Sequence, residues 1–257
     1  MEFTISNIVS DVTLSSEINL DSLFQHIEIH KISKKTIEDL MKKEQKSRKK
    51  KTVEPELPKK VPFFGTNGVC ISFRYKKKSK GYRPELKKTS AFADGDIQYA
   101  GKNYHFKISK KRINLLGVKE YKLLPEIYDV IIKIINDSER NRKDGLPIFV
   151  GEEELQHTSL KINNVLVNGT FFTNEENKYS LTKLSKGLKD SISSDNISVE
   201  FDNNIKKEIT VKFFKDDQSM GKCIIKSNGK TTFTLKLEEK ELVSIISFMY
   251  NSVSKLL

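Results

Sequence analysis

The sequence predicts an α+β fold in which an antiparallel sheet, built from two similar halves, is covered on one face by helices. Several short segments alternate apolar and polar side chains with the period of two that is typical of strands. Two longer segments, 125–135 and 242–256, repeat apolar residues at helical spacing. The order of strand, helix, several strands and long helix occurs twice along the chain. This repetition indicates an internal duplication.

The first half opens with a strand that has apolar residues on both faces and continues with a short helix. Asn19 or Asp21 can cap this helix, because either side chain accepts from a first-turn N–H group. A later hairpin is interrupted by Lys110-Lys111, and Pro125 opens the long helix near its first turn. The expected strands of this half are Phe3–Leu14, Gly68–Tyr75, Asn103–Ile108 and Arg112–Val118.

The second half follows a polar segment rich in turn-forming residues. Its expected helices are 180–192, with Leu181, Leu184, Leu188 and Ile192 on one face, and 242–256. Its expected strands are Ser159–Phe172, Ser198–Phe201, Glu208–Phe214, Gly221–Ser227 and Lys230–Leu237. We therefore expect a first repeat over 1–136, a connector over 137–154 and a second repeat over 155–257.

The net charge of the 257-residue chain is +12, and it is concentrated in two Lys-rich segments. Residues 41–60 hold nine Lys or Arg against three Glu, which gives +6, and residues 74–88 hold eight against Glu85, which gives +7. The sum of +13 leaves −1 for the remaining residues. Two insertions, 41–60 and 75–96, are therefore expected to be solvated linkers or localisation signals, or else arms that contact phosphate groups.

Other signals exclude several classes of protein. No apolar run is long enough to span a membrane, and the N-terminus has no basic region before an apolar one, so we expect a soluble intracellular protein. Two Cys and four His form neither a disulfide framework nor the spacing of a zinc site. No nucleophile and base stand in a recognisable order, and residues 216–223 lack the first Gly and the Ser or Thr of a phosphate loop. We expect no metal, no cofactor and no enzymatic reaction.

Two short motifs recur in the duplicated order of elements. The opening strands contain Asn7-Ile8-Val9 and Asn163-Asn164-Val165, and similar hairpins over 106–119 and 224–234 each precede a long helix. This order resembles the TATA-box-binding protein family, most closely the TATA-binding-protein-like factors of large nucleocytoplasmic DNA viruses, with an early-branching eukaryote or archaeon as the alternative source. The resemblance implies a saddle-shaped antiparallel sheet of two pseudo-symmetric repeats, with helices on the convex face.

The resemblance also implies a set of DNA-contacting residues. Asn7 and Asn163 match amides that donate to the minor groove, where A·T pairs present only acceptors. Positions that lie on the groove floor match Val9, Val165, Asn114, Leu116, Thr232 and Thr234. Period two places Arg112 on one face with Asn114 and Leu116, whereas Ile113 and Leu115 face the core. Arg74 and Lys212 are the expected phosphate contacts at the rim.

The family also inserts Phe side chains into base steps. Phe63 or Phe64 and Phe201 match these wedges, each only with a gap in the alignment. Ile108 replaces one partner wedge, and the other aligns with Lys226, unless a shifted register brings in Ile225. Core packing is the alternative for every one of these apolar residues.

The function implied by the resemblance is that of a general transcription initiation factor, which binds and bends A/T-rich promoter DNA through the minor groove. The implied partners are double-stranded DNA, a protein like transcription factor IIB and a multisubunit RNA polymerase, with no membrane. Two alternatives are a sequence-nonspecific architectural DNA-binding protein and a protein–protein interaction module that uses the same sheet. The expected location is the host nucleus or a cytoplasmic viral factory, with packaging in the virion as a further alternative.

Overall fold

A computed structural model describes residues 3–27, 69–79, 90–173, 179–202 and 207–257. The same order of elements occurs twice in these residues. The first series is β1 (Phe3–Leu14), α1 (Leu20–His26), β2 (Val69–Ser79), β3 (Ser90–Tyr99), β4 (Lys102–Ile108), β5 (Arg112–Val118) and α3 (Leu123–Arg140). The second series is β6 (His157–Thr170), α4 (Leu181–Ile192), β7 (Ile197–Asp202), β8 (Glu208–Lys215), β9 (Gln218–Lys226), β10 (Lys230–Leu235) and α5 (Glu239–Ser254).

The strands are hydrogen-bonded in the order β2-β3-β4-β5-β1-β6-β10-β9-β8-β7. This order is symmetric about the β1–β6 pair. Neighbouring strands are antiparallel within the run β2-β3-β4-β5 and within the run β6-β10-β9-β8-β7. The predicted class, α+β with an open antiparallel sheet, is confirmed.

The chain divides into two compact units. The C-terminal unit consists of residues 1–10, 117–121 and 162–257, and the N-terminal unit of residues 11–116 and 122–161. The boundary between them passes through β1, β5 and β6, so each of these strands contributes residues to both units.

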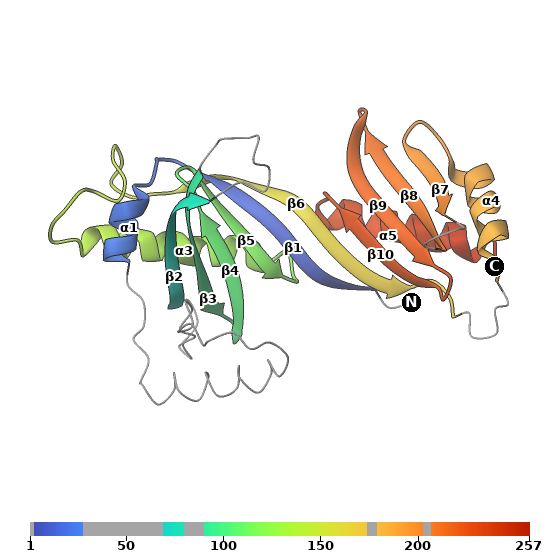
Figure 1. The fold of residues 1–257 in the computed structure, drawn as a ribbon, viewed down its shortest axis with the longest axis horizontal. Coiled ribbons are helices and arrows are strands. Elements are labelled where there is room, and N and C mark those ends of the chain that lie inside the picture. The colour runs from blue at the N-terminus through green and yellow to red at the C-terminus, as the bar shows by residue number, and fades with distance from the viewer. Residues whose placement is uncertain (1–2, 28–68, 80–89, 174–178, 203–206) are drawn as a thin grey trace. The chain divides into compact units, whose positions relative to one another are not determined.

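The core of the C-terminal unit lies between its strands and the helices α4 and α5, which lie on the same side of β8–β10 (Figure 1). Phe233 is fully buried, and its ring makes edge contacts with the rings of Phe3 and Phe171 at centroid distances of 5.7 and 6.0 Å. Such aromatic pairs contribute about 0.5–1.5 kcal/mol beyond the area that they bury. Cys223 lies in the same core, and burial raises the pKa of its thiol.

The core of the N-terminal unit forms between β3–β5 and the amphipathic helix α3. Phe106, Ile113 and Leu115 are buried on the strand side, and Tyr128 and Ile131 on the helix side. The short helix α1 begins at the predicted cap, because the N–H of Ser22 donates to Asn19 Oδ1 at 3.1 Å.

One expected insertion is shorter than predicted. Residues 75–96 were expected to form a loop, but β2 extends to Ser79 and β3 begins at Ser90. Asp94-Gly95-Asp96 disfavours a strand by propensity, yet Gly95 lies opposite Phe106 on the core face of the sheet and Asp96 lies opposite His105. Residues 80–89, and the whole insertion at 41–60, lie outside the described residues.

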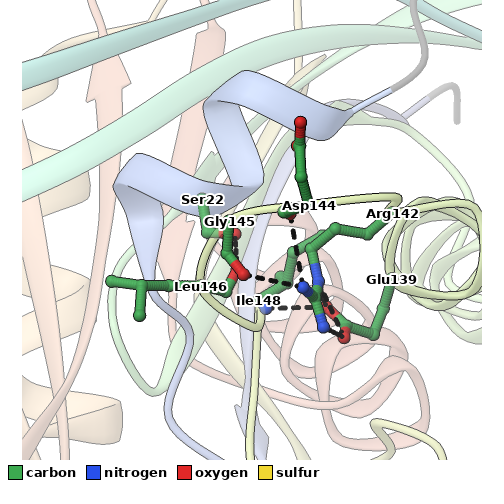
Figure 2. A network of polar contacts seen from close by, with 7 residues as sticks. All are labelled: Ser22, Glu139, Arg142, Asp144, Gly145, Leu146 and Ile148. Atoms are coloured by element: carbon green, nitrogen blue, oxygen red, sulfur yellow. Dashed lines mark hydrogen bonds and ion pairs between the residues drawn. The ribbon is translucent and has the colours of Figure 1, made fainter.

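The segment expected to connect the repeats is held against the N-terminal unit. Helix α3 includes its first residues, and Ile148 and Phe149 are buried. Figure 2 shows Arg142 between Glu139 and the loop at 144–146, where its guanidinium donates to the carbonyl of Gly145 at 2.9 Å. The Glu139 carboxylate accepts from Arg142 and from the N–H of Ile148, and these bonds hold its pKa below the ordinary value.

None of the helices in the described parts of the chain is long and apolar enough to cross a membrane.

Candidate nucleic-acid interface

The face of the C-terminal unit opposite α4 and α5 carries two rows of aligned side chains, which we call the C-terminal sheet face. Both rows follow from the pairing register across the five strands β6, β10, β9, β8 and β7. The first row is Asn168, Thr232, Ile224, Thr210 and Glu200. The second row is Leu166, Thr234, Lys222, Lys212 and Ser198.

Amide and hydroxyl groups are hydrogen-bonded to one another at the β1 side of this face. The hydroxyl of Thr232 donates to Asn168 Oδ1 at 3.0 Å, and Asn168 Nδ2 donates to Ser6 Oγ at 2.7 Å. Sequence reasoning predicted Thr232 and Thr234 for this face but missed Asn168. The signal for Asn168 was its spacing of two residues from Leu166.

Asn7 and Val9 lie on the exposed side of β1, because Ile8 and Ser10, which alternate with them along the strand, are fully buried. The N–H of Gly117 donates to Asn7 Oδ1 at 2.7 Å. The amide oxygen is therefore directed at β5, and the Nδ2 group is the donor that can reach a ligand.

In β6 the predicted register is wrong by one residue. Val165 was expected on the exposed face, but it is fully buried opposite Leu235 in the core. Alternation places Asn163 on the same side of the strand as Val165. Asn164-Val165-Leu166 is therefore the equivalent of Asn7-Ile8-Val9, and Asn164 and Leu166 lie on the C-terminal sheet face.

Two predicted wedges also face the core rather than the exposed side. Ile108 is fully buried opposite Ile113, and Phe201 lies opposite the buried Ile209. The alternative wedge Ile225 is buried as well, and its neighbour Ile224 takes the exposed side. These three residues are in phase with core residues of their own strands, so pleating directs them toward the helices. Phe63 and Phe64 lie outside the described residues.

Lys212 lies at the predicted place but is already paired. Its Nζ is 2.5 Å from Glu200 Oε1 on the adjacent strand β7. Lys222, which lies beside Lys212 in the register, is exposed and belongs to the same row. The positive charge on this face is therefore best represented by Lys222, which the sequence analysis did not select.

The corresponding surface of the N-terminal unit, formed by β3–β5 on the side away from α3, is the N-terminal sheet face. The predicted alternation in β5 is confirmed, because Ile113 and Leu115 are fully buried while Arg112 is exposed and Asn114 and Leu116 are half-buried. Lys107 lies opposite Asn114, with its Nζ 5.8 Å from the centre of the Phe92 ring. Arg74 belongs to β2, where its register partner is Asp94.

This N-terminal sheet face differs in charge from the C-terminal one. His105 lies between two carboxylates of β3, with Nδ1 3.0 Å from Asp96 Oδ1 and Nε2 3.8 Å from Asp94 Oδ2. Asp94 is almost completely buried, and Asp96 is partly exposed. Within the described part of the chain no group of three His, Cys, Asp or Glu is arranged to hold a metal ion.

Comparison with known proteins gives similarity at the level of structure and not of sequence. No family model matches the sequence, and no curated protein matches it. A solved structure titled Methanococcus jannaschii TBP is similar, with 12% sequence identity, a TM-score of 0.49 and coverage of 99% of each chain.

Proposed function

We propose that the chain binds duplex DNA through its exposed sheet faces, with contacts centred on the C-terminal sheet face. The observation that supports this most is the composition of that face. Across adjacent strands it combines half-buried apolar side chains, hydroxyls and amides with an exposed lysine, Lys222, and none of the helices described in its own unit lies over it (Figure 1).

The chemistry of this face suits the minor groove of A/T-rich DNA. The A·T floor presents only acceptors, which a donor such as Asn7 Nδ2 can satisfy. Val9, Leu166 and Ile224 offer apolar contact where the A·T floor lacks the amino donor that G·C pairs carry. Lys222 supplies a phosphate contact at a distance of two strands from β6.

The more specific part of the proposal is a role as a general initiation factor that bends promoter DNA and recruits a protein like transcription factor IIB and an RNA polymerase. It is supported by the duplicated order of elements and by Asn7-Ile8-Val9 with its equivalent Asn164-Val165-Leu166. On the N-terminal sheet face, Arg112, Asn114, Leu116 and Arg74 are the residues proposed to contact DNA. A viral origin and action in a host nucleus or viral factory belong to the same proposal.

A second candidate function is favoured by the carboxylates of the N-terminal sheet face. Asp96, which is partly exposed, stands where a phosphate-binding surface would carry positive charge, and the almost completely buried Asp94 adds negative charge beneath it. Such a face suits a basic segment of a partner protein, which is the interaction-module alternative.

The test is equilibrium binding of the full chain to A/T-rich and G/C-rich duplexes of equal length across a salt series, with end-labelled DNA to report bending by energy transfer. The proposal expects bending and a preference for A/T-rich DNA of about tenfold or more. Lys222→Glu should reduce the affinity for DNA. It should also lower the slope of log affinity against log salt by an amount that corresponds to about one to two phosphate contacts.

The matched control is Lys186→Glu, because Lys186 is exposed on α4, on the helix side of the same unit. An equal loss of DNA affinity in both variants would mean that binding depends on net charge alone. Steeply salt-dependent binding with no preference and no bend would support the architectural alternative. Absence of DNA binding would leave the protein-binding function as the candidate.

A further inference from the structure

The C-terminal unit has an apolar groove on its helix side, away from the C-terminal sheet face. It lies between α5 and the ends of β7–β9 and has a volume of about 640 Å³. Ile197, Phe214, Met220, Ile245 and Phe248 line it. This volume is within the range of about 300–1,000 Å³ that ligand pockets occupy.

The outer surface of α5 continues this groove without charge. Residues 242–254 contain no charged side chain, although 31% of the chain is charged. Phe248, which lines the groove, is 40% exposed, whereas Val243, which is 57% exposed, lies about 140° around the helix from it, on the opposite flank of α5. The remaining exposed positions of this stretch are Ser244, Ser247, Asn251 and Ser254.

The corresponding helix of the N-terminal unit provides the contrast. Exposed positions of α3 include Glu126, Asp129, Lys133 and Arg140, which is the usual composition of a solvated helix face. Helices α3 and α5 are each the last element of their series, so their position in the series does not explain why only the α5 surface lacks charge. Depletion of charge together with an exposed aromatic side chain is typical of the centre of a protein–protein interface.

The charged residues that line the groove are Lys215, Asp216, Lys240 and Glu241, and acidic groups predominate in the two segments that carry them, 215–217 and 236–241. Lys215 lies 3.6 Å from Glu241, and these two groups neutralise each other. The other exposed charges of the two segments, which we call the rim, are Asp216, Asp217, Glu238 and Glu239 against Lys236 and Lys240. The net charge of this rim is therefore −2.

We propose that this groove and the uncharged surface of α5 bind an amphipathic segment of a partner protein. The segment inserts two or three bulky apolar side chains into the groove and places Lys or Arg residues beside the acidic rim. Binding of this kind does not depend on the proposed DNA contacts, since α5 lies on the other side of the sheet of its unit from the C-terminal sheet face (Figure 1).

The probe is a fluorescein-labelled helical peptide of about 16 residues, with Leu at every third or fourth position and Lys at most others. The control peptide has Glu in place of Lys. Anisotropy of the full chain with each peptide should show saturable binding of the Lys peptide and binding at least about fivefold weaker for the Glu peptide. Phe248→Asp should weaken binding of the Lys peptide by about tenfold or more, as expected for a central apolar contact.

The matched control is Thr182→Asp, which adds the same charge at an exposed position of α4. Circular dichroism and thermal unfolding check that both variants fold, and Ile245→Ala provides a second substitution among the residues that line the groove. Equal binding of the two peptides, or binding unaffected by Phe248→Asp and Ile245→Ala, would overturn the proposal. A dimer in sedimentation that these two substitutions dissociate would assign the surface to a second copy of the chain and overturn it as well.

Affinity for A/T-rich DNA is measured on the same variants. Phe248→Asp should leave it within about twofold of the original value. Peptide binding without DNA binding would count against the proposed function while supporting the groove. DNA binding without peptide binding would support the proposed function and count against the groove proposal.

Discussion

The backbone N–H of Gly117 donates to the side-chain oxygen of Asn7 at 2.7 Å, and this bond sets the orientation of the Asn7 amide. An N–H donor must face the oxygen, so the amide nitrogen is the group left for a ligand. The role proposed for Asn7 as a donor to minor-groove acceptors thus depends on a bond made within the protein.

We predict that Asn7→Ala lowers affinity for A/T-rich DNA by about 1 kcal/mol, the typical net value of one hydrogen bond. Asn7→Asp should lower it further, because it keeps the acceptor for Gly117 but replaces the donor with a negative charge near phosphate groups. Fluorescence anisotropy measures both. The control, Asn251→Ala, removes an exposed amide from α5 and should have no effect. Unchanged affinity in both Asn7 variants would remove Asn7 from the DNA-binding face.

Asp96 tests which ligand the N-terminal sheet face binds. If this face contacts DNA, Asp96→Asn should raise affinity by about twofold to tenfold, because it removes a charge that repels phosphate and keeps an oxygen beside His105. If the face binds a basic protein segment, the same substitution weakens that interaction. Asp190→Asn on α4 is the charge-matched control. Identical affinities for the two variants would contradict contact between DNA and this face.

Gly221 makes the closest backbone approach in β9. Its φ is +127°, and a Cβ at this position would lie 2.0 Å from the carbonyl oxygen of Thr234. Gly221→Ala should therefore destabilise the C-terminal unit by about 2 kcal/mol or more, by strain and by displacement of β10. Gly151 has a φ of +91° with open space around it, so Gly151→Ala should cost only about 1 kcal/mol. Urea unfolding compares the two, and an equal loss of stability would contradict the steric argument.

Acidification should weaken the contact that holds the connector. The pKa of Glu139 is lowered by its hydrogen bonds to Arg142 and Ile148, so the stabilisation is complete above the ordinary Glu value of 4.5 and is lost as the pH falls through the folded-state pKa. Glu139→Gln should cost about 1 kcal/mol at neutral pH and reduce the slope of stability against pH below 4.5. Hydrogen exchange at Ile148, whose N–H donates to this carboxylate, provides the local measurement. The same slope in the variant would contradict a contribution from this carboxylate.

Regular periodicity made much of the fold predictable from the sequence. In β5, Ile113 and Leu115 alternate with polar neighbours, and both are fully buried. Strand β3 was missed because Asp94, Gly95 and Asp96 carry no such alternation. Cross-strand partners in β2 and β4 stabilise it, and the residue pattern of β3 by itself does not reveal them.

Register was harder to predict than the strands themselves. Val165, Leu166 and Val167 are all apolar, and Asn163 and Asn164 are both amides, so alternation fits either face of β6 equally well. Only the pairing of Val165 with Leu235 and of Val167 with Phe233 distinguishes the two. Ile108 shares the core phase of Tyr104 and Phe106, whereas the family resemblance implies an exposed wedge at this position.

The passage of β1 and β6 through both compact units means that the two halves of the chain that repeat the order of elements do not correspond to the two units of the folded molecule. Each unit needs a strand segment encoded in the other half before its sheet is complete. A chain cut within the connector would yield two fragments, neither of which contains a whole unit. A substitution in β1 or β6 is therefore expected to act on one unit or the other, according to the part of the strand in which it lies.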